Sequence, residues 1–295
     1  MRARYPDQEG YIERGGVRTF YEVHGNGTPT VLFFPAWAVG HSRIWKGQIP
    51  YFARHYRVVA FDPRGNGKSD RPRDAAAYAD AEYVQDALAV MDATGTERAV
   101  VVGVSRGAWY AAMLAAQYPN RVVGAVLAGS WSPLGQTPPE RSAYSFEEPL
   151  ETEEGWAKFN RHYWLKDYRG FLEFFFSKIF AEPHSTKQIE DGVAWGLETT
   201  PDVLIATVRS RNFLDPLIAD PEGARALYRS IRCPMLLIHG DQDAVQSLTR
   251  GAAIAEAKGA PLVTILGGGH GNFARDPVKA NLMLRAFIDR VCPPR

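Results

Sequence analysis

Nucleophilic chemistry in this sequence centres on Ser105, which lies in the run Gly103-Val-Ser-Arg-Gly107. A serine hydroxyl is a weak nucleophile, so a histidine must take its proton and a carboxylate must orient the histidine and stabilise its cation. His270 stands in a glycine-rich run, and Asp241 and Asp243 follow another apolar run. The sequence therefore predicts a nucleophilic Ser105, a base at His270 and an orienting acid at Asp241 or Asp243.

The residues around Ser105 predict a strand, a tight turn and a helix. The β-branched run 99–102 precedes the motif, and an alanine-rich helical pattern follows it as far as Tyr118. Gly103 and Gly107 remove Cβ atoms where a strand and a helix crowd together, which leaves Ser105 projecting from the bend. We therefore expect Ser105 to be exposed to a substrate.

The elements that must position these residues alternate along the chain. Apolar runs predict strands at 17–23, 30–34, 57–61, 99–104, 122–128, 233–238 and 262–266, and helical patterns cover 80–94, 252–257 and 278–291. Such alternation is typical of a parallel α/β sheet with right-handed crossovers. Because the carboxyl ends of parallel strands share one edge, the loops bearing Ser105, Asp243 and His270 can converge there.

One long segment lacks this alternation. Residues 132–228 are rich in aromatic residues and prolines and contain no β-branched run, which predicts several short helices. We expect a helical cap inserted over the carboxyl edge of the sheet, with residues 1–131 and 229–295 forming the core domain. A separate helical domain is the alternative, but the strand pattern resumes directly after the segment.

The composition restricts the partners of the chain. It has 295 residues, 45% hydrophobic and 23% charged, and a net charge of +1, which favours neither nucleic acid nor an anionic membrane as partner. Neither an apolar signal segment nor a membrane-spanning run is present, so a cytoplasmic protein is expected. Cys233 and Cys292 are expected to be free thiols. No cofactor or metal is expected, and the oligomeric state is expected to be a monomer or a homodimer.

The glycine-rich run Asp62-Pro-Arg-Gly-Asn-Gly-Lys-Ser-Asp70 is not a nucleotide-binding loop. A phosphate-binding loop would need glycine where the chain has Asp62, and a dinucleotide loop would need glycine where it has Asp70. A tight polar loop at the carboxyl end of a strand is the better interpretation.

Taken together, these motifs resemble the α/β-hydrolase superfamily. The resemblance rests on 103–107, 62–69, His239-Gly-Asp-Gln-Asp243 and the glycine–histidine pair ending at His270, in the family's order of serine, acid and histidine. It implies an eight-stranded, mostly parallel sheet with a helical cap inserted after the sixth strand. It also selects Asp243 as the acid.

The resemblance further implies that the backbone N–H groups of Trp37 and Arg106 stabilise the oxyanion. Many family members have His-Gly where this chain has Pro35-Ala36. Because the donors are backbone groups, this departure is expected to alter the shape of the oxyanion hole rather than to abolish it.

Other polar residues near these motifs are expected to be structural. His239 is interpreted as a buried structural histidine, Asp241 as a capping residue and Arg64 as the anchor of a loop. His24 and His41 are expected at the surface, although His41 could line the site near Trp37.

The expected activity is hydrolysis of an ester, thioester or lactone with an apolar portion, a small molecule bound in an apolar pocket under the cap. The same residues also serve C–C bond hydrolysis, acyl transfer, or a lyase or cyclisation step, so these remain alternatives. A ligand-binding protein with a vestigial triad is a third hypothesis.

Overall fold

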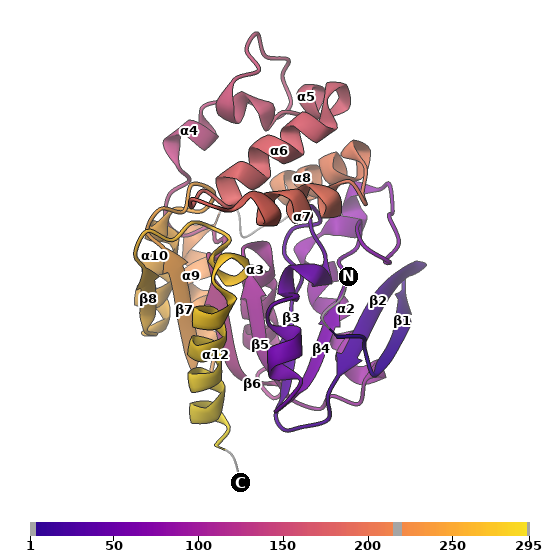
Figure 1. Ribbon diagram of the computed structural model, residues 1–295, viewed down its shortest axis with the longest axis vertical. Coiled ribbons are helices and arrows are strands. Elements are labelled where there is room, and N and C mark those ends of the chain that lie inside the picture. Colours follow the sequence, from indigo (N-terminus) through magenta and orange to yellow (C-terminus); the bar gives the residue numbers. More distant parts are fainter. Residues whose placement is uncertain (1–3, 215–219, 294–295) are drawn as a thin grey trace.

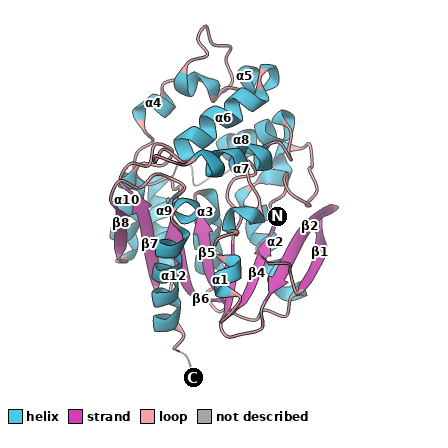
Figure 2. Cartoon of the chain, viewed as in Figure 1, coloured by secondary structure: helices cyan, strands magenta, loops and turns pink. Residues whose placement is uncertain are grey.

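A single twisted sheet forms the centre of the computed structural model, which describes residues 4–214 and 220–293 (Figures 1 and 2). Its eight strands are ordered β1-β2-β4-β3-β5-β6-β7-β8. Their bounds are β1 Gln8–Arg14, β2 Val17–His24, β3 Thr30–Phe33, β4 Arg57–Phe61, β5 Ala99–Val104, β6 Val122–Ala128, β7 Met235–Gly240 and β8 Leu262–Ile265. β2 is antiparallel to β1 and β4, and every other neighbouring pair is parallel. The predicted eight-stranded, mostly parallel sheet is confirmed.

Helices surround this sheet. The α-helices are α1 Ile49–Phe52, α2 Asp80–Ala93, α3 Arg106–Gln117, α4 Pro139–Ser142, α5 Arg161–Lys166, α6 Tyr168–Ile179, α7 Thr186–Gly196, α8 Pro201–Leu214, α9 Pro221–Ser230, α10 Leu248–Lys258, α11 Asn272–Arg275 and α12 Pro277–Val291. Three short 3₁₀ helices are η1 Ser42–Trp45, η2 Ala75–Tyr78 and η3 Gly155–Lys158. No helix among the described residues is long and apolar enough to cross a membrane.

The central strand β5 shows why its sequence is continuously apolar. Ala99 and Val101 belong to the hydrophobic cluster shared with α2 and α3, whereas Val100 and Val102 belong to the cluster shared with α12 on the opposite face. A parallel strand covered on both faces must be apolar at every position. The valine run of β5 is therefore explained by its burial between two helical layers.

The first strand was missing from the sequence-based prediction. β1 is one of the two edge strands of the sheet, and Ile12 is its one buried residue. An edge strand with one covered side chain carries little of the apolar alternation that marks a strand. β1 is nevertheless paired with β2 over its whole length.

The segment between β6 and β7 divides into two parts. The helices from α4 to α8 lie together over one end of the sheet (Figure 1). By contrast, Ala224 and Tyr228 of α9 are buried in the cluster formed by α2, α3 and the sheet. The boundary expected at residue 228 therefore falls inside a helix that packs with the core, because α9 fills the layer beside α3.

Two histidines expected at the surface are buried. His24 is 1% exposed at the end of β2, and His41 is 3% exposed between the loop after β3 and the cap. The sequence places both beside turn residues, which misled the prediction. His41 lies against Glu198, which follows α7, and His24 pairs with Val58 of β4 in the sheet. Arg64 does hold its loop, since it donates to Asp86 and to the carbonyl of Ala77.

Candidate active site

Ser105 lies at the sharp turn between β5 and α3. Its backbone has φ of 57° and ψ of −122°, a combination that non-glycine residues rarely adopt. A Cβ atom at Gly103 would collide with the carbonyl of Gly107, and one at Gly107 would collide with the carbonyl of Pro35. Both glycines are therefore required by close approach of backbone to backbone, as their positions in the sequence predict.

His270 and Asp243 are joined directly. His270 lies in the loop after β8 and Asp243 in the loop after β7, and Nδ1 of His270 is 2.7 Å from Oδ2 of Asp243. A carboxylate can only accept, so Nδ1 carries the proton and Nε2 is left as the basic nitrogen. The two loops expected to converge do so at the carboxyl edge of the sheet.

The carboxylate of Asp243 is held in one orientation and in its charged form. Its Oδ1 accepts hydrogen bonds from the N–H groups of Val245 and Gln246, at 2.8 and 2.7 Å. Burial by itself would raise the pKa of Asp243. The rings of His270 and His239 outweigh burial and hold this pKa well below its usual value. Asp243 is therefore an ionised acceptor for His270.

Ser105 and His270 line one cavity of about 90 Å³. Among the described residues, these two supply its hydroxyl and imidazole groups, and the remaining walls are apolar side chains and glycine. The walls supplied by the cap include Phe175, Phe176 and Trp195. No hydrogen bond joins Ser105 to His270 in this conformation of the described chain, and such bonds commonly tighten only when substrate binds.

Trp37 and Arg106, whose backbone N–H groups are the expected oxyanion donors, lie in the loop after β3 and at the start of α3. Arg106 is the first residue of α3, so its N–H has no partner within the helix. Trp37 lines the cavity from the loop after β3. In the described part of the chain, neither N–H donates to another group of the protein. Pro35-Ala36 therefore leaves both amides free to serve as donors.

The rival residues have other partners. Nε2 of His239 is 2.9 Å from the carbonyl oxygen of Gln246, and the ring is 1% exposed. The Oδ1 of Asp241 accepts a hydrogen bond from the N–H of Gly267, so it ties two loops together. It was expected to be a capping residue, and this bond shows a different role. Nε2 of His239 also lies 3.3 Å from Oδ2 of Asp243, so this ring contacts the carboxylate itself. Neither residue lines the cavity.

A buried ion pair stands directly behind the nucleophile, and the sequence did not reveal it. The guanidinium of Arg106 contacts Oδ1 of Asp80, and Oδ2 of Asp80 accepts from the indole of Trp109 at 2.7 Å. Burial would lower the pKa of Arg106, but Asp80 raises it above its ordinary value. The first turns of α2 and α3 are thus locked together next to Ser105. The side chain of Trp109 is fully buried in the core.

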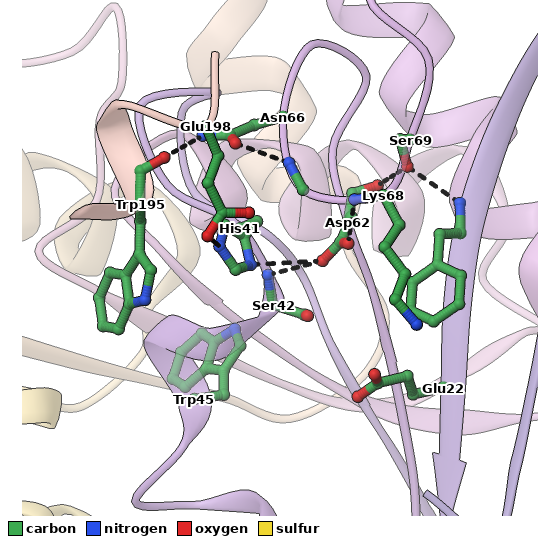
Figure 3. A network of polar contacts seen from close by, with 12 residues as sticks. Glu22, His41, Ser42, Trp45, Asp62, Asn66, Lys68, Ser69, Trp195 and Glu198 are labelled. Atoms are coloured by element: carbon green, nitrogen blue, oxygen red, sulfur yellow. Dashed lines mark hydrogen bonds and ion pairs between the residues drawn. The ribbon is translucent and has the colours of Figure 1, made fainter. Parts of the chain in front are cut away.

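The loop after β3 ends in a second polar cluster, shown in Figure 3. The ring of His41 lies 3.7 Å from Asp62 and 3.4 Å from Glu198, and contact with His41 lowers the pKa of Glu198. Glu198 follows α7, so this cluster connects the core to the cap. His41 does not line the cavity at Ser105.

The described residues contain no group of three histidine, cysteine, aspartate or glutamate side chains arranged to hold a metal ion. Cys233 and Cys292 are free.

Known proteins share this fold and parts of this sequence. A family model described as "alpha/beta hydrolase fold" matches residues 29–277. The "Bifunctional esterase/perhydrolase DCH" of Acinetobacter calcoaceticus is 28% identical over 288 residues, which cover 95% of this chain and 99% of that protein. A solved structure described as "Est816 as an N-Acyl homoserine lactone degrading enzyme" aligns with a TM-score of 0.74 and 26% identity, over 94% of this chain and all of that one.

A shorter match involves another activity. The "Putative carbamate hydrolase RutD" of Variovorax paradoxus (strain S110) is 34% identical over 131 residues, which are 44% of this chain. The matched segment spans about half the length of that relative, 47%.

Proposed function

Because this chain belongs to the alpha/beta hydrolase family, we propose that it is a serine hydrolase that cleaves esters, thioesters or lactones with a compact apolar portion. The observation that carries this proposal is the placement of Ser105 and of the Asp243–His270 pair at one apolar cavity. Water-mediated cleavage of an acyl bond needs a nucleophile, a base with a fixed tautomer and oxyanion donors, and we assign these roles to Ser105, to His270 and to the N–H groups of Trp37 and Arg106.

The reaction proceeds in two halves. Ser105 Oγ attacks the carbonyl carbon while its proton passes to Nε2 of His270, and the oxyanion accepts hydrogen bonds from the N–H groups of Trp37 and Arg106. The tetrahedral intermediate collapses, and His270 gives the proton to the departing alcohol or thiol. A water molecule then attacks the acyl-enzyme, gives its proton to His270, and releases the acid. Ser105 regains its proton from His270.

The helices from α4 to α8 serve as the cap that shapes the substrate site. Among them, α6 and α7 supply Phe175, Phe176 and Trp195 to the walls of the cavity, whose apolar lining favours an uncharged substrate portion. The names of the similar proteins, an esterase/perhydrolase and a lactone-degrading enzyme, support the same range of acyl substrates.

A fluorophosphonate probe tests the proposal. The wild-type protein is expected to take up one probe per chain, mapped by mass spectrometry to the peptide containing Ser105, because the probe reacts with an activated serine. Ser105→Ala is expected to take up none. Ser130→Ala, which removes a buried serine hydroxyl at the end of β6, serves as the matched control and is expected to label normally. A wild-type protein that resists the probe, or labelling of Ser105→Ala, would refute the proposal.

The size of the cavity predicts a preference for short acyl chains. Its volume of about 90 Å³ is smaller than the roughly 150 Å³ cavity that holds benzene in another protein. For p-nitrophenyl esters, kcat/KM is expected to be at least about tenfold higher for acetate or butyrate than for octanoate, since each excess methylene must displace packed side chains.

Enlarging the cavity is expected to reduce this preference. Phe176→Ala removes a wall of the cavity, so kcat/KM for the octanoate ester should approach kcat/KM for the butyrate ester. Phe174 lies on the same helix but outside the cavity, and Phe174→Ala should leave the ratio of these two kcat/KM values unchanged. A kcat/KM that rises steadily up to octanoate in the wild-type protein would show that the cavity does not limit the acyl chain.

A further inference from the structure

The side chain of Trp37 is packed inside the cap, although its backbone belongs to the core. Its indole ring makes an edge-to-face contact with Phe175 at 5.5 Å between ring centres and lies 5.9 Å from the rings of Phe159 and Trp164. Trp37 is only 8% exposed. The residue whose backbone N–H is offered to the oxyanion is thus anchored by its side chain in another layer of the molecule.

One hydrogen bond sets the direction of this ring. The indole Nε1–H of Trp37 donates to Oγ1 of Thr207 in α8 at 2.7 Å, and both side chains are buried. The hydroxyl of Thr207 donates its own hydrogen to the carbonyl of Leu204 at 2.6 Å. Because that hydrogen is already used, a lone pair of the hydroxyl faces the indole. The acceptor is oriented before any substrate binds.

The same loop is tied to the cap at two further points (Figure 3). The amide of Asn66 donates to the carbonyl of Ala38, the residue after Trp37, and to the carbonyl of Trp195 in α7. The loop then ends at His41, which lies 3.4 Å from Glu198. These contacts restrain the loop downstream of Trp37, while Thr207 restrains Trp37 itself.

We propose that Thr207 is a positioning residue for the oxyanion hole: through the indole of Trp37, the cap sets the place of the Trp37 backbone N–H. This inference rests on the proposed hydrolase function. It makes the cap part of the apparatus that stabilises the transition state, beyond its part in shaping the pocket. Within this packing, the hydrogen bond to Thr207 sets the direction of the Trp37 ring, so removing the acceptor is expected to shift the Trp37 backbone, and small displacements of catalytic groups cost large factors in rate.

The test compares three variants of α8. Thr207→Val keeps the shape of the side chain but removes the acceptor, and its kcat for p-nitrophenyl butyrate is expected to fall by about 10- to 30-fold with KM within about twofold of wild type. Thr207→Ser retains the hydroxyl, and its kcat is expected to lie within about threefold of the wild-type value. Ser210→Ala removes another buried hydroxyl of α8 and serves as the control, with kcat close to wild type.

Two further measurements separate positioning from general damage. Rates are expressed per active site titrated with the fluorophosphonate, so unfolded molecules do not contribute. Trp37→Phe removes the indole N–H but keeps an aromatic ring, and we expect it to lower kcat as much as Thr207→Val does. Combining the two substitutions is expected to add no further loss, because they break the same bond.

Wild-type kcat in Thr207→Val would overturn the inference, as would a change in KM alone or fully additive losses in the double variant. Failure of the hydrolase proposal itself would look different, because the wild-type protein would then take up no probe.

Discussion

The Asp243→Asn variant is expected to lose about 10⁴-fold in kcat, with little change in KM. The geometry around the carboxylate explains why. The N–H groups of Val245 and Gln246 both donate to Oδ1, so an asparagine would direct its oxygen toward them and its NH₂ group toward Nδ1 of His270. Nδ1 would then have to accept, and the imidazole proton would move to Nε2. A protonated Nε2 cannot take the proton of Ser105.

Asp241→Asn is the matched control. Asp241 lies two residues before Asp243 in the chain, accepts a hydrogen bond from the N–H of Gly267 and does not line the cavity. Its kcat is expected to remain within about threefold of wild type. The assignment of the acid would be contradicted if Asp241→Asn abolished turnover while Asp243→Asn retained it.

The pH dependence of this effect has a definite sign. The pKa of Asp243 is depressed in the folded protein, so its contribution is complete above the pKa of an unfolded aspartate, about 3.9, and disappears only as the pH falls through the lower folded value. We therefore expect the Asp243 carboxyl to remain ionised from pH 5 to pH 9, so its own titration adds nothing to the pH profile of the wild-type enzyme in that range. Infrared difference spectra of wild type against Asp243→Asn that showed this carboxyl taking up a proton between pH 7 and pH 5 would contradict this expectation.

The largest expected effect on stability comes from Asp80→Asn. This change leaves the guanidinium of Arg106 buried without its carboxylate, and breaking one partner of a buried pair typically costs about 3–5 kcal/mol. Both side chains are 4% exposed, so water cannot replace the lost partner. Urea unfolding should show a lower midpoint with an unchanged slope, since the surface exposed on unfolding is the same.

A second aspartate of α2 provides the control. Asp92 also pairs with an arginine, Arg121, at 2.7 Å, but its side chain is 67% exposed. Asp92→Asn is expected to change the free energy of unfolding by less than about 1 kcal/mol. In addition, Asp80→Asn combined with Arg106→Met should recover part of the stability, because no buried charge then remains unpaired. If Asp80→Asn and Asp92→Asn lowered the free energy of unfolding equally, burial would not determine how much the Asp80–Arg106 pair contributes to stability.

Much of the fold could be predicted because its signals are local. The valine run of β5 and the glycines at 103 and 107 are adjacent in the chain to the turn that they form. Each predicted strand was located within a few residues of its observed bounds, and only the edge strand β1 was missed. The expected end of the cap at residue 228 falls inside α9, because α9 is helical like the helices before it and no local pattern marks its packing beside α3.

Buried polar partners could not be predicted in this way. The surroundings of His41, the pairing of Asp80 with Arg106 and the bond between Trp37 and Thr207 all join residues that belong to different elements. Nothing in the pattern near His41 distinguishes an exposed loop histidine from one covered by Glu198. The contacts of His41 and Trp37 depend on how the cap and the core approach one another, and the Asp80–Arg106 pair depends on how α2 packs against α3.

By itself, the sequence determined the sheet and the loops that carry Ser105, Asp243 and His270, because apolar periodicity and glycine act on neighbouring residues. Only the tertiary structure decided how these loops are held. Trp37 and Thr207 are 170 positions apart, and their hydrogen bond forms because the cap folds back onto the loop after β3. Contacts at such a separation depend on the packing of whole layers, which leaves no local pattern in the chain.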